Sequence, residues 1–332
     1  MLYMRMFVLL ALFLNQAFGR EQIETSGYNP SDPVPGISVA VSLTPLSSPF
    51  FIAEELGFFT QQNVNVKLLP CQGGVACAEM LFNQRADLAT FSDSVVMFQG
   101  FKSPVFSVLT TFVRTDSDLR LLTLKKNDIA SVAQLADKKV GVVKASASEF
   151  YIDSMRISHA IDKSRIHKVY LKPDQLGNAL QSGLVDAISV WEPWGHQLEV
   201  KASQNVADLS LKGIYSLSFN LSTLTESVEK HRKGYLRVLS ALEMSINWMT
   251  DHPDMAKILI AKRLNVESME LAEMWESYAF RLSLSNSLLS ELQLQARWAK
   301  DEGLVKGPAP KFRNLIDNSF LKQLAEMEHA GP

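Results

Sequence analysis

The sequence has 332 residues, of which 47% are hydrophobic and 20% are charged, and its formal net charge is −2. A chain of this length favours two domains, and this composition is ordinary for a globular protein. Neither the net charge nor any run of Lys or Arg gives a reason to expect nucleic acid or an anionic membrane as a partner.

The first 19 residues have the layout of a secretory signal peptide. Arg5 precedes an apolar run over residues 6–14, and Ala17 and Gly19 are small residues at the spacing of a cleavage site. The run is shorter than the roughly 20 residues of a membrane span, and an uncleaved anchor is the alternative. We therefore expect export to the periplasm, with residues 20–36 as a flexible lead rich in Pro, Ser and Asn.

From residue 37 onward, segments typical of strands alternate with segments typical of helices. This alternation favours βαβ units and largely parallel sheets. After Glu226 the pattern changes to long helical segments. One apolar helix face contains Tyr235, Val238, Leu239, Leu242 and Ile246. Strands are expected near residues 37–43, 64–69, 87–91, 105–113, 119–125, 139–143, 166–171, 186–191 and 214–220.

Two extended segments, residues 103–116 and 212–224, are expected to cross between domains. A chain that crosses twice makes a discontinuous first lobe, residues 37–112 and 218–332, and an inserted second lobe, residues 113–217. Two crossing strands can act as a hinge that closes the lobes over a ligand.

Cys71 and Cys77 flank a predicted chain reversal at Gly73 and Gly74. The reversal can bring the two sulfur atoms within bonding reach in an oxidising compartment. Two reduced, buried cysteines are the alternative. No His or further Cys stands nearby at the spacing of metal ligands.

The sequence lacks the usual signals of catalysis. It contains no G-x-S-x-G elbow, no phosphate-binding Walker loop and no G-x-G-x-x-G dinucleotide motif. Its six histidines are dispersed and are expected on the surface or in the core. We therefore expect a protein that is not an enzyme and needs no metal or cofactor.

Ordered fragments of the chain resemble a known family of binding proteins. They include ELGFFTQQNVNVKLLP, GGVACAEMLFNQRADLATFSDS, ASVAQLADKKVGVVKASASEFY, VYLKPDQLGNALQSGLVDAISVWEPW and ARWAKDEGLV, over roughly residues 37–305. The chain is similar to exported solute-binding proteins of ABC importers, in the group that binds sulfonates, taurine, nitrate or pyrimidine precursors of thiamine. The resemblance implies an α/β, two-lobed type II periplasmic binding protein fold. Two Rossmann-like, parallel-sheet lobes would be joined by two hinge strands, with a helical C-terminal region.

The same resemblance implies a binding site in turns that follow the strands. The implied ligand-binding residues are Thr44, Pro45, Leu46, Gln72, Gly73, Gly74, Ser92, Asp93, Ser94, Ser146, Ala147, Ser148, Trp191 and Glu192.

The chemistry of these turns suits a small, polar solute. Helix N-termini leave backbone N–H groups free and carry partial positive charge, so they hold sulfonate, carboxylate or nitrate. Ser146 and Glu149 can instead form a capping box. Gly73 and Gly74 can admit a ligand close to the backbone or form an ordinary tight turn. Trp191 can cover a ligand or belong to the core.

Two acidic side chains among these residues complicate the binding of a bare anion. Asp93 and Glu192 would repel a bare anion unless these carboxylates face away or pair with an ammonium or amidine group of the ligand. This favours a zwitterion such as an aminosulfonate, or a basic heterocycle. Asp93 can also cap its own helix. Arg114 can pair with Glu192 or with an anionic group, or lie solvated on the surface.

The leading hypothesis is a monomeric periplasmic protein that binds a sulfonate-like or related nitrogen-containing solute and delivers it to an ABC permease in the inner membrane. Alternatives are a binder of a thiamine pyrimidine precursor or a biosynthetic relative of the same fold, and a soluble periplasmic sensor of the same fold. In the leading hypothesis the small solute is bound by lobe closure and is not transformed.

Overall fold

The computed structural model describes residues 36–102, 105–202 and 205–329. All of them belong to one compact unit, residues 33–332. The predicted signal peptide and nearly all of the predicted lead lie outside the described residues. In the part of the chain that is described, no helix is long and apolar enough to cross a membrane.

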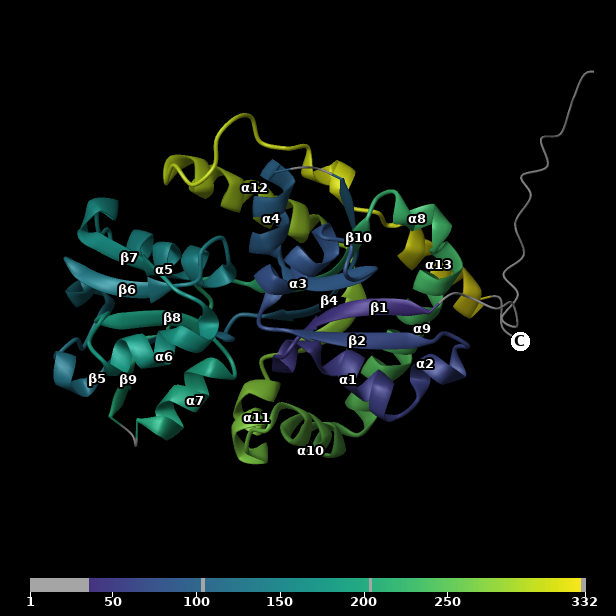
Figure 1. Ribbon diagram of the computed structural model, residues 1–332, viewed down its shortest axis with the longest axis horizontal. Helices are drawn as coiled ribbons and strands as arrows, with labels where there is room; N and C mark the ends of the chain where they lie inside the picture. The colour runs from purple at the N-terminus through teal and green to yellow at the C-terminus, as the bar shows by residue number, and fades with distance from the viewer. Residues whose placement is uncertain (1–35, 103–104, 203–204, 330–332) are drawn as a thin grey trace, which may run out of the picture. The chain divides into compact units, whose positions relative to one another are not determined.

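Two β-sheets form the framework of the protein, each in its own lobe (Figure 1). The sheet of lobe 1 has the strand order β11-β4-β10-β3-β1-β2. β1 pairs in parallel with β2 and β3, whereas β10 is antiparallel to both β3 and β4. Its strands are β1 (Ile37–Ser42), β2 (Val66–Cys71), β3 (Leu88–Ser92), β4 (Phe106–Thr115), β10 (Leu217–Leu224) and β11 (Ala279–Ser283).

The sheet of lobe 2 has the order β7-β6-β8-β5-β9. β6 is parallel to β7 and β8, and β5 is antiparallel to β8 and β9. The two-lobed α/β fold is therefore confirmed, with mixed sheets in which the parallel strands carry the βαβ units. The strands are β5 (Leu119–Leu124), β6 (Lys138–Val142), β7 (Ile166–Tyr170), β8 (Ala187–Trp191) and β9 (Val206–Asp208).

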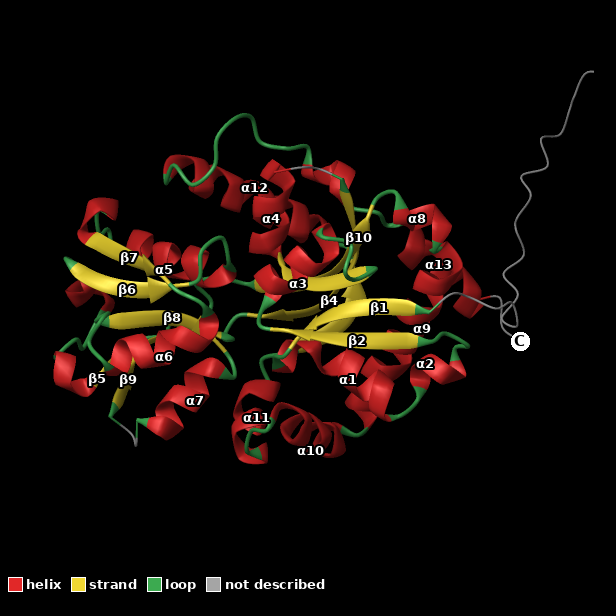
Figure 2. Cartoon of the chain, in the orientation of Figure 1, coloured by secondary structure: helices red, strands yellow, loops and turns green. Residues whose placement is uncertain are grey.

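Helices cover both faces of the sheets (Figure 2). Most of them start just after the carboxyl end of a strand, which collects helix N-termini at one edge of each sheet. Lobe 1 contains α1 (Ser48–Glu55), α2 (Phe58–Gln61), α3 (Gly74–Phe82) and α4 (Asp93–Lys102), and lobe 2 contains α5 (Ala147–Ser158), α6 (Pro173–Gln181) and α7 (Trp194–Lys201). Short 3-10 helices are η1 (Pro45–Ser47), η2 (Lys125–Asn127), η3 (Val132–Leu135), η4 (Lys163–Arg165) and η5 (Phe312–Leu315).

The C-terminal region is helical apart from β11, as expected. The predicted apolar face lies on α9, and all five of its residues are buried. The sequence did not predict β11 or β9. β11 is an edge strand whose residues are half-buried or exposed, so it lacks an apolar run, and β9 is only three residues long. The helices are α8 (Ser227–Lys230), α9 (Arg232–Asp251), α10 (Pro253–Leu264), α11 (Ser268–Trp275), α12 (Asn286–Asp301) and α13 (Ser319–His329).

The chain passes from lobe 1 to lobe 2 between β4 and β5 and returns between β9 and β10. β4 remains paired with β10 as far as Thr115, so the first passage comprises residues 116–118. That is slightly later than the predicted boundary after residue 112. The return comprises residues 209–216, next to the predicted boundary after residue 217. We keep the division into hinged lobes as a proposal.

Candidate functional site

A pocket with about 350 Å³ of empty space, which includes open solvent, lies between the two lobes. Lobe 1 contributes Ser42, Thr44, Leu46, Gly74, Val75, Ser92, Val95, Leu217 and Phe219, and the first passage and lobe 2 contribute Asp118, Ser146, Ala147 and Trp191.

The cavity lies where parallel strands end. Ser42 is the last residue of β1, Ser92 of β3 and Trp191 of β8. Open α/β sheets bind ligands in the crevice outside these carboxyl ends, at the point where the strand order reverses. The topology of each lobe thus brings distant loops to one place.

Three helices also begin at the cavity. Gly74 is the first residue of α3, Ser92 immediately precedes α4, and Ser146 is the N-cap of α5. The free N–H groups of a helix start carry partial positive charge. Among the described residues that line the cavity there is no Lys, Arg or His, so these backbone groups are its main positive field.

Four side chains in the cavity wall have a polar atom without a hydrogen-bond partner among the described residues. The atoms are Ser42 Oγ, Thr44 Oγ1, Asp118 Oδ2 and Trp191 Nε1. None of these residues is more than 7% exposed. Buried polar groups in folded proteins are normally paired, so their concentration in one cavity indicates a place for a polar solute.

Trp191 of lobe 2 lies directly against Gly73 of lobe 1. A Cβ atom added to Gly73 would be 2.5 Å from Trp191 Cζ2, and Gly73 has a φ of +85°, which favours glycine. Gly74 faces Phe91, whose Cα would be 2.9 Å from an added Cβ. Trp191 and Phe91, and not a ligand, therefore occupy the space next to the two glycines.

The predicted site residues divide into two groups. The cavity wall contains Thr44, Leu46, Gly74, Ser92, Ser146, Ala147 and Trp191. The wall does not contain Pro45, Gln72, Gly73, Asp93, Ser94, Ser148 or Glu192. Among the second group, Pro45 begins η1, Gln72 is exposed, and Ser148 Oγ accepts a hydrogen bond from Val143 N at 3.0 Å.

Ser146 caps its own helix and also lines the cavity. Its Oγ accepts a hydrogen bond from Ser148 N at 3.2 Å and donates one to the Val143 carbonyl at 2.7 Å. Glu149 Oε2 accepts from Ala145 N at 2.8 Å. Both hydrogen bonds of the Ser146 hydroxyl are thus made within its own turn. At this position a solute can interact with the N-terminus of α5.

Asp93 is buried behind the cavity wall with partners of its own. Its carboxylate accepts hydrogen bonds from the hydroxyl of Tyr215 and from Gln295 Nε2, the latter at 3.1 Å. Burial is the main reason why the pKa of Asp93 is raised to about 7. Ser94 contacts the same Tyr215 hydroxyl at 3.1 Å.

Glu192 is likewise engaged within the protein. It accepts a hydrogen bond from Arg120 Nη1 at 2.5 Å and another from His196 N at 2.9 Å. Burial raises the pKa of Glu192, and the nearby Arg120 opposes this shift. The considered pairing of Glu192 with Arg114 does not form, because Arg114 pairs with Glu291 and Ser287.

Asp118 is the acidic residue that lines the cavity, and sequence reasoning missed it. Its Oδ1 accepts a hydrogen bond from the Tyr278 hydroxyl at 2.9 Å, while Oδ2 has no partner among the described residues. Burial foremost raises its pKa to about 8; Glu192 adds to the rise, and Tyr278 and Arg120 oppose it. The only available signal was its place after a hinge strand, which it shares with Asp116.

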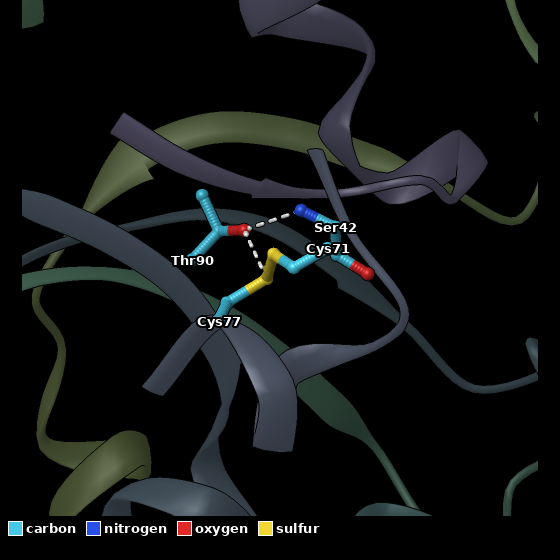
Figure 3. The surroundings of a disulfide bond; sticks show 4 residues. All are labelled: Ser42, Cys71, Cys77 and Thr90. Carbon is cyan, nitrogen blue, oxygen red and sulfur yellow. Dashed lines mark hydrogen bonds between the residues drawn. A yellow bond between two sulfur atoms is a disulfide. The ribbon is translucent and has the colours of Figure 1, made fainter. Parts of the chain in front are cut away.

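Cys71 and Cys77 form a disulfide bond beside the cavity (Figure 3). It joins the last residue of β2 to the first turn of α3 and so encloses the turn with Gly73 and Gly74. Thr90 Oγ1 lies next to this bond and accepts a hydrogen bond from Ser42 N at 3.1 Å. The cross-link restrains the loop against which Trp191 rests.

Residues 44–256 match the family model described as NMT1/THI5 like. The chain belongs to the NMT1/THI5-like family. The match covers more than half of the sequence and confirms the resemblance to substrate-binding proteins of ABC importers. It includes most of the turns from which the cavity is built.

Individual relatives agree with this assignment. The chain is 23% identical over 296 residues to a putative aliphatic sulfonates-binding protein of Bacillus subtilis, covering 86% of this chain and 87% of that one. The alkanesulfonate-binding protein SsuA of Xanthomonas axonopodis pv. citri, solved bound to MOPS, superposes with a TM-score of 0.78 at 14% identity. This superposition covers 87% of this chain and 100% of that chain, and it supports the fold.

The same fold also occurs in an enzyme. The desulfurization enzyme DSZB matches with a TM-score of 0.61 at 14% identity, over 88% of this chain and 99% of that chain. One fold can host different functions, so the fold alone does not show whether this protein is an enzyme.

Proposed function

We propose that this protein is the exported solute-binding component of an ABC importer and holds a small organosulfonate in the cavity between its lobes. The observation that carries this proposal is the group of unpaired, buried polar atoms that line the cavity together with helix starts. Membership of the NMT1/THI5-like family and the similarity to a sulfonate-binding relative support it.

The chemistry of a sulfonate suits the cavity wall. Its three oxygens accept hydrogen bonds, which the hydroxyls of Ser42 and Thr44 and the indole N–H of Trp191 can donate. Helix starts at α3 and α5 favour the negative charge. Apolar neighbours such as Leu46 and Phe219 can enclose the organic part of the solute.

We propose that the protein binds its solute without transforming it. A nucleophile needs a neighbouring base that activates it. The described cavity wall contains no Cys and no His, and the hydroxyl of Ser146 is bonded to a backbone carbonyl. Asp118, the carboxylate in this wall, is hydrogen-bonded to Tyr278, and the hydroxyls of Ser42 and Thr44 form no hydrogen bond with it. The two cysteines of the chain are bonded to each other.

Transport would follow from closure of the lobes around the solute. The cavity draws on both lobes, so a solute that contacts both sides stabilises the closed form. We propose that the closed protein acts as a monomer in the periplasm and is recognised by a permease of the inner membrane. The predicted signal peptide and the disulfide support export to an oxidising compartment.

A thiamine pyrimidine precursor is the second candidate solute. It is favoured by the presence of an indole and an acidic side chain, Trp191 and Asp118, in one cavity wall. An aromatic ring could stack on the indole, and a ring nitrogen or exocyclic amine could bond to the carboxyl group.

Thermal unfolding of the mature protein with added solutes tests both candidates. A ligand that binds only the native state raises the melting temperature. We expect an increase with alkanesulfonates or taurine. An increase with aminopyrimidines alone would refute the sulfonate proposal and support the second candidate, whereas nitrate serves as an anion without an organic part.

A Trp191→Phe variant shows whether the proposed cavity is the binding site. The change keeps an aromatic ring but removes the N–H donor, so we expect sulfonate affinity to fall about tenfold, the effect of one hydrogen bond. Trp248→Phe is the matched control, because Trp248 lies on α9 and stacks on His252, with its ring centroid 4.9 Å away. Equal affinity in the two variants would contradict the proposed site.

A further inference from the structure

Asp118 is the only ionisable side chain among the described residues that line the cavity. It is 1% exposed, and the partner of its Oδ2 atom must come from outside the described protein groups. A carboxyl group in this setting determines which solutes fit, because a mismatched group would leave it buried and unpaired.

The orientation of Asp118 is set by its neighbours. Tyr278 O–H donates to Oδ1 at 2.9 Å, and the Asp118 carbonyl accepts a hydrogen bond from Glu192 N at 3.3 Å. Tyr278 is itself buried, and the residue after Asp118 begins β5. Because the side chain and the backbone of Asp118 are both hydrogen-bonded, its Oδ2 atom is fixed at the cavity wall.

Among the described residues, no cation forms an ion pair with Asp118. The nearby Arg120 already binds three other carboxylates, Glu192 at 2.5 Å, Glu199 at 2.8 Å and Asp208 at 3.0 Å. Glu192 and burial both make ionisation of Asp118 less favourable. A positively charged group of a solute would reverse this penalty, because an opposite charge stabilises the carboxylate.

We propose that Asp118 is the specificity-determining residue of the cavity and selects solutes in which a protonated amine or amidine accompanies the anionic group. The N–H of the solute donates to Asp118 Oδ2, while the anionic group takes the hydroxyl, indole and helix-start donors. This inference rests on the proposed function, in which the anionic group is a sulfonate.

A pair of probes that differ only in the amine tests the inference. Taurine is ethanesulfonate with an amino group on its second carbon. Titration calorimetry of the mature protein at pH 8 should give at least tenfold tighter binding for taurine than for ethanesulfonate, a ratio that corresponds to about one charged hydrogen bond.

Two variants then assign the preference to one carboxylate. Asp118→Asn keeps the size of the side chain and removes its charge, so we expect the ratio of the two affinities to fall to within about threefold of unity. Binding of ethanesulfonate should persist, which also shows that the variant is folded. Asp116→Asn is the matched control, because Asp116 lies two residues away and is exposed; it should keep the parent ratio.

The outcomes separate the two proposals. If ethanesulfonate binds the parent protein as tightly as taurine does, the role of Asp118 is overturned, while the sulfonate function stands. A second pair, 4-aminopyrimidine and pyrimidine, covers the case in which neither sulfonate binds. A preference for the aminopyrimidine that Asp118→Asn abolishes would support the inference and overturn the sulfonate function, and no binding by any of these probes would overturn both.

Discussion

The lobes contact each other in two regions, which differ in whether their buried polar groups are hydrogen-bonded. In the cavity, Ser42, Thr44, Asp118 and Trp191 keep polar atoms without partners among the described residues. Where α5 meets α12, the buried Asp153 carboxylate bonds to Trp298 of α12 and contacts Arg156 of its own helix. This difference suggests that the first region is built for a solute and the second for stability.

The α5–α12 contact centres on Asp153. Its Oδ2 accepts hydrogen bonds from Trp298 Nε1 at 3.0 Å and from Lys168 Nζ at 2.5 Å. Arg156 contacts the same carboxylate and donates to Glu302 Oε1 at 2.7 Å. Because lobe 1 supplies Trp298 and Glu302 and lobe 2 supplies the others, this network joins the lobes without help from a solute.

The largest expected effect comes from filling the space between Gly73 and Trp191. In Gly73→Ala the new Cβ would clash with the indole at 2.5 Å, so the lobes cannot meet as they do here, and we expect solute affinity to fall at least a hundredfold. Calorimetric titration measures this loss.

Gly183→Ala provides the control for backbone strain. Gly183 also has a positive φ, +76°, but nothing lies within 4 Å of an added Cβ. Gly183→Ala should lose about 1 kcal/mol of stability, because alanine is disfavoured at positive φ. Gly73→Ala should lose more, because the φ of 85° and ψ of 162° at Gly73 lie in a region that only glycine adopts readily. If Gly73→Ala binds as tightly as Gly183→Ala, the contact between Gly73 and Trp191 has no role in binding.

A smaller effect, on stability instead of binding, is expected from Trp298→Phe. The change removes the N–H donor to the buried Asp153 carboxylate, which should lower the free energy of unfolding by about 2 kcal/mol. Urea denaturation measures it, with Trp248→Phe as the control. An unchanged free energy of unfolding would show that this network does not hold the lobes, and the contrast with the cavity would disappear.

A further prediction is a dependence of stability on pH. The pKa values of Asp93 and Asp118 are raised from 3.8 to about 7 and about 8. Above pH 3.8 and up to these raised pKa values, the two groups bind more protons in the folded protein than in the unfolded chain. The free energy of unfolding should therefore be highest near pH 4 and fall towards pH 8, by at most ~1.4 kcal/mol per pH unit for each group. Glu192, whose pKa is also raised by burial, changes stability in the same direction.

Asp118→Asn sharpens this measurement. It should flatten the fall in stability between pH 7 and pH 8, where Asp118 still titrates after Asp93 has lost its proton. Urea denaturation across the pH range follows it, with Asp116→Asn as the control. Parent stability that stays constant from pH 4 to pH 8 would contradict the buried, protonated state of both groups.

Much of the fold could be read from local patterns. Buried strands such as β3 and β8 are short apolar runs, and the apolar face of α9 repeats with the period of a helix, so both are visible in a window of a few residues. Strands without such a run, β9 and β11, were not visible. The turns after β1, β3 and β8 were found because a strand end followed by a helix start is also a local feature.

What the local patterns determined, then, is the order of strands and helices, the family and the approximate location of the site. Only the tertiary structure decided which acidic residue faces the cavity, because the answer depends on contacts between distant parts of the chain. Asp93 is hydrogen-bonded to Tyr215 and Gln295, and Glu192 to Arg120. Tyr278 donates a hydrogen bond to one oxygen of Asp118, and the other oxygen is left at the cavity. Burial and pairing are properties of these long-range contacts, and no window of sequence contains them.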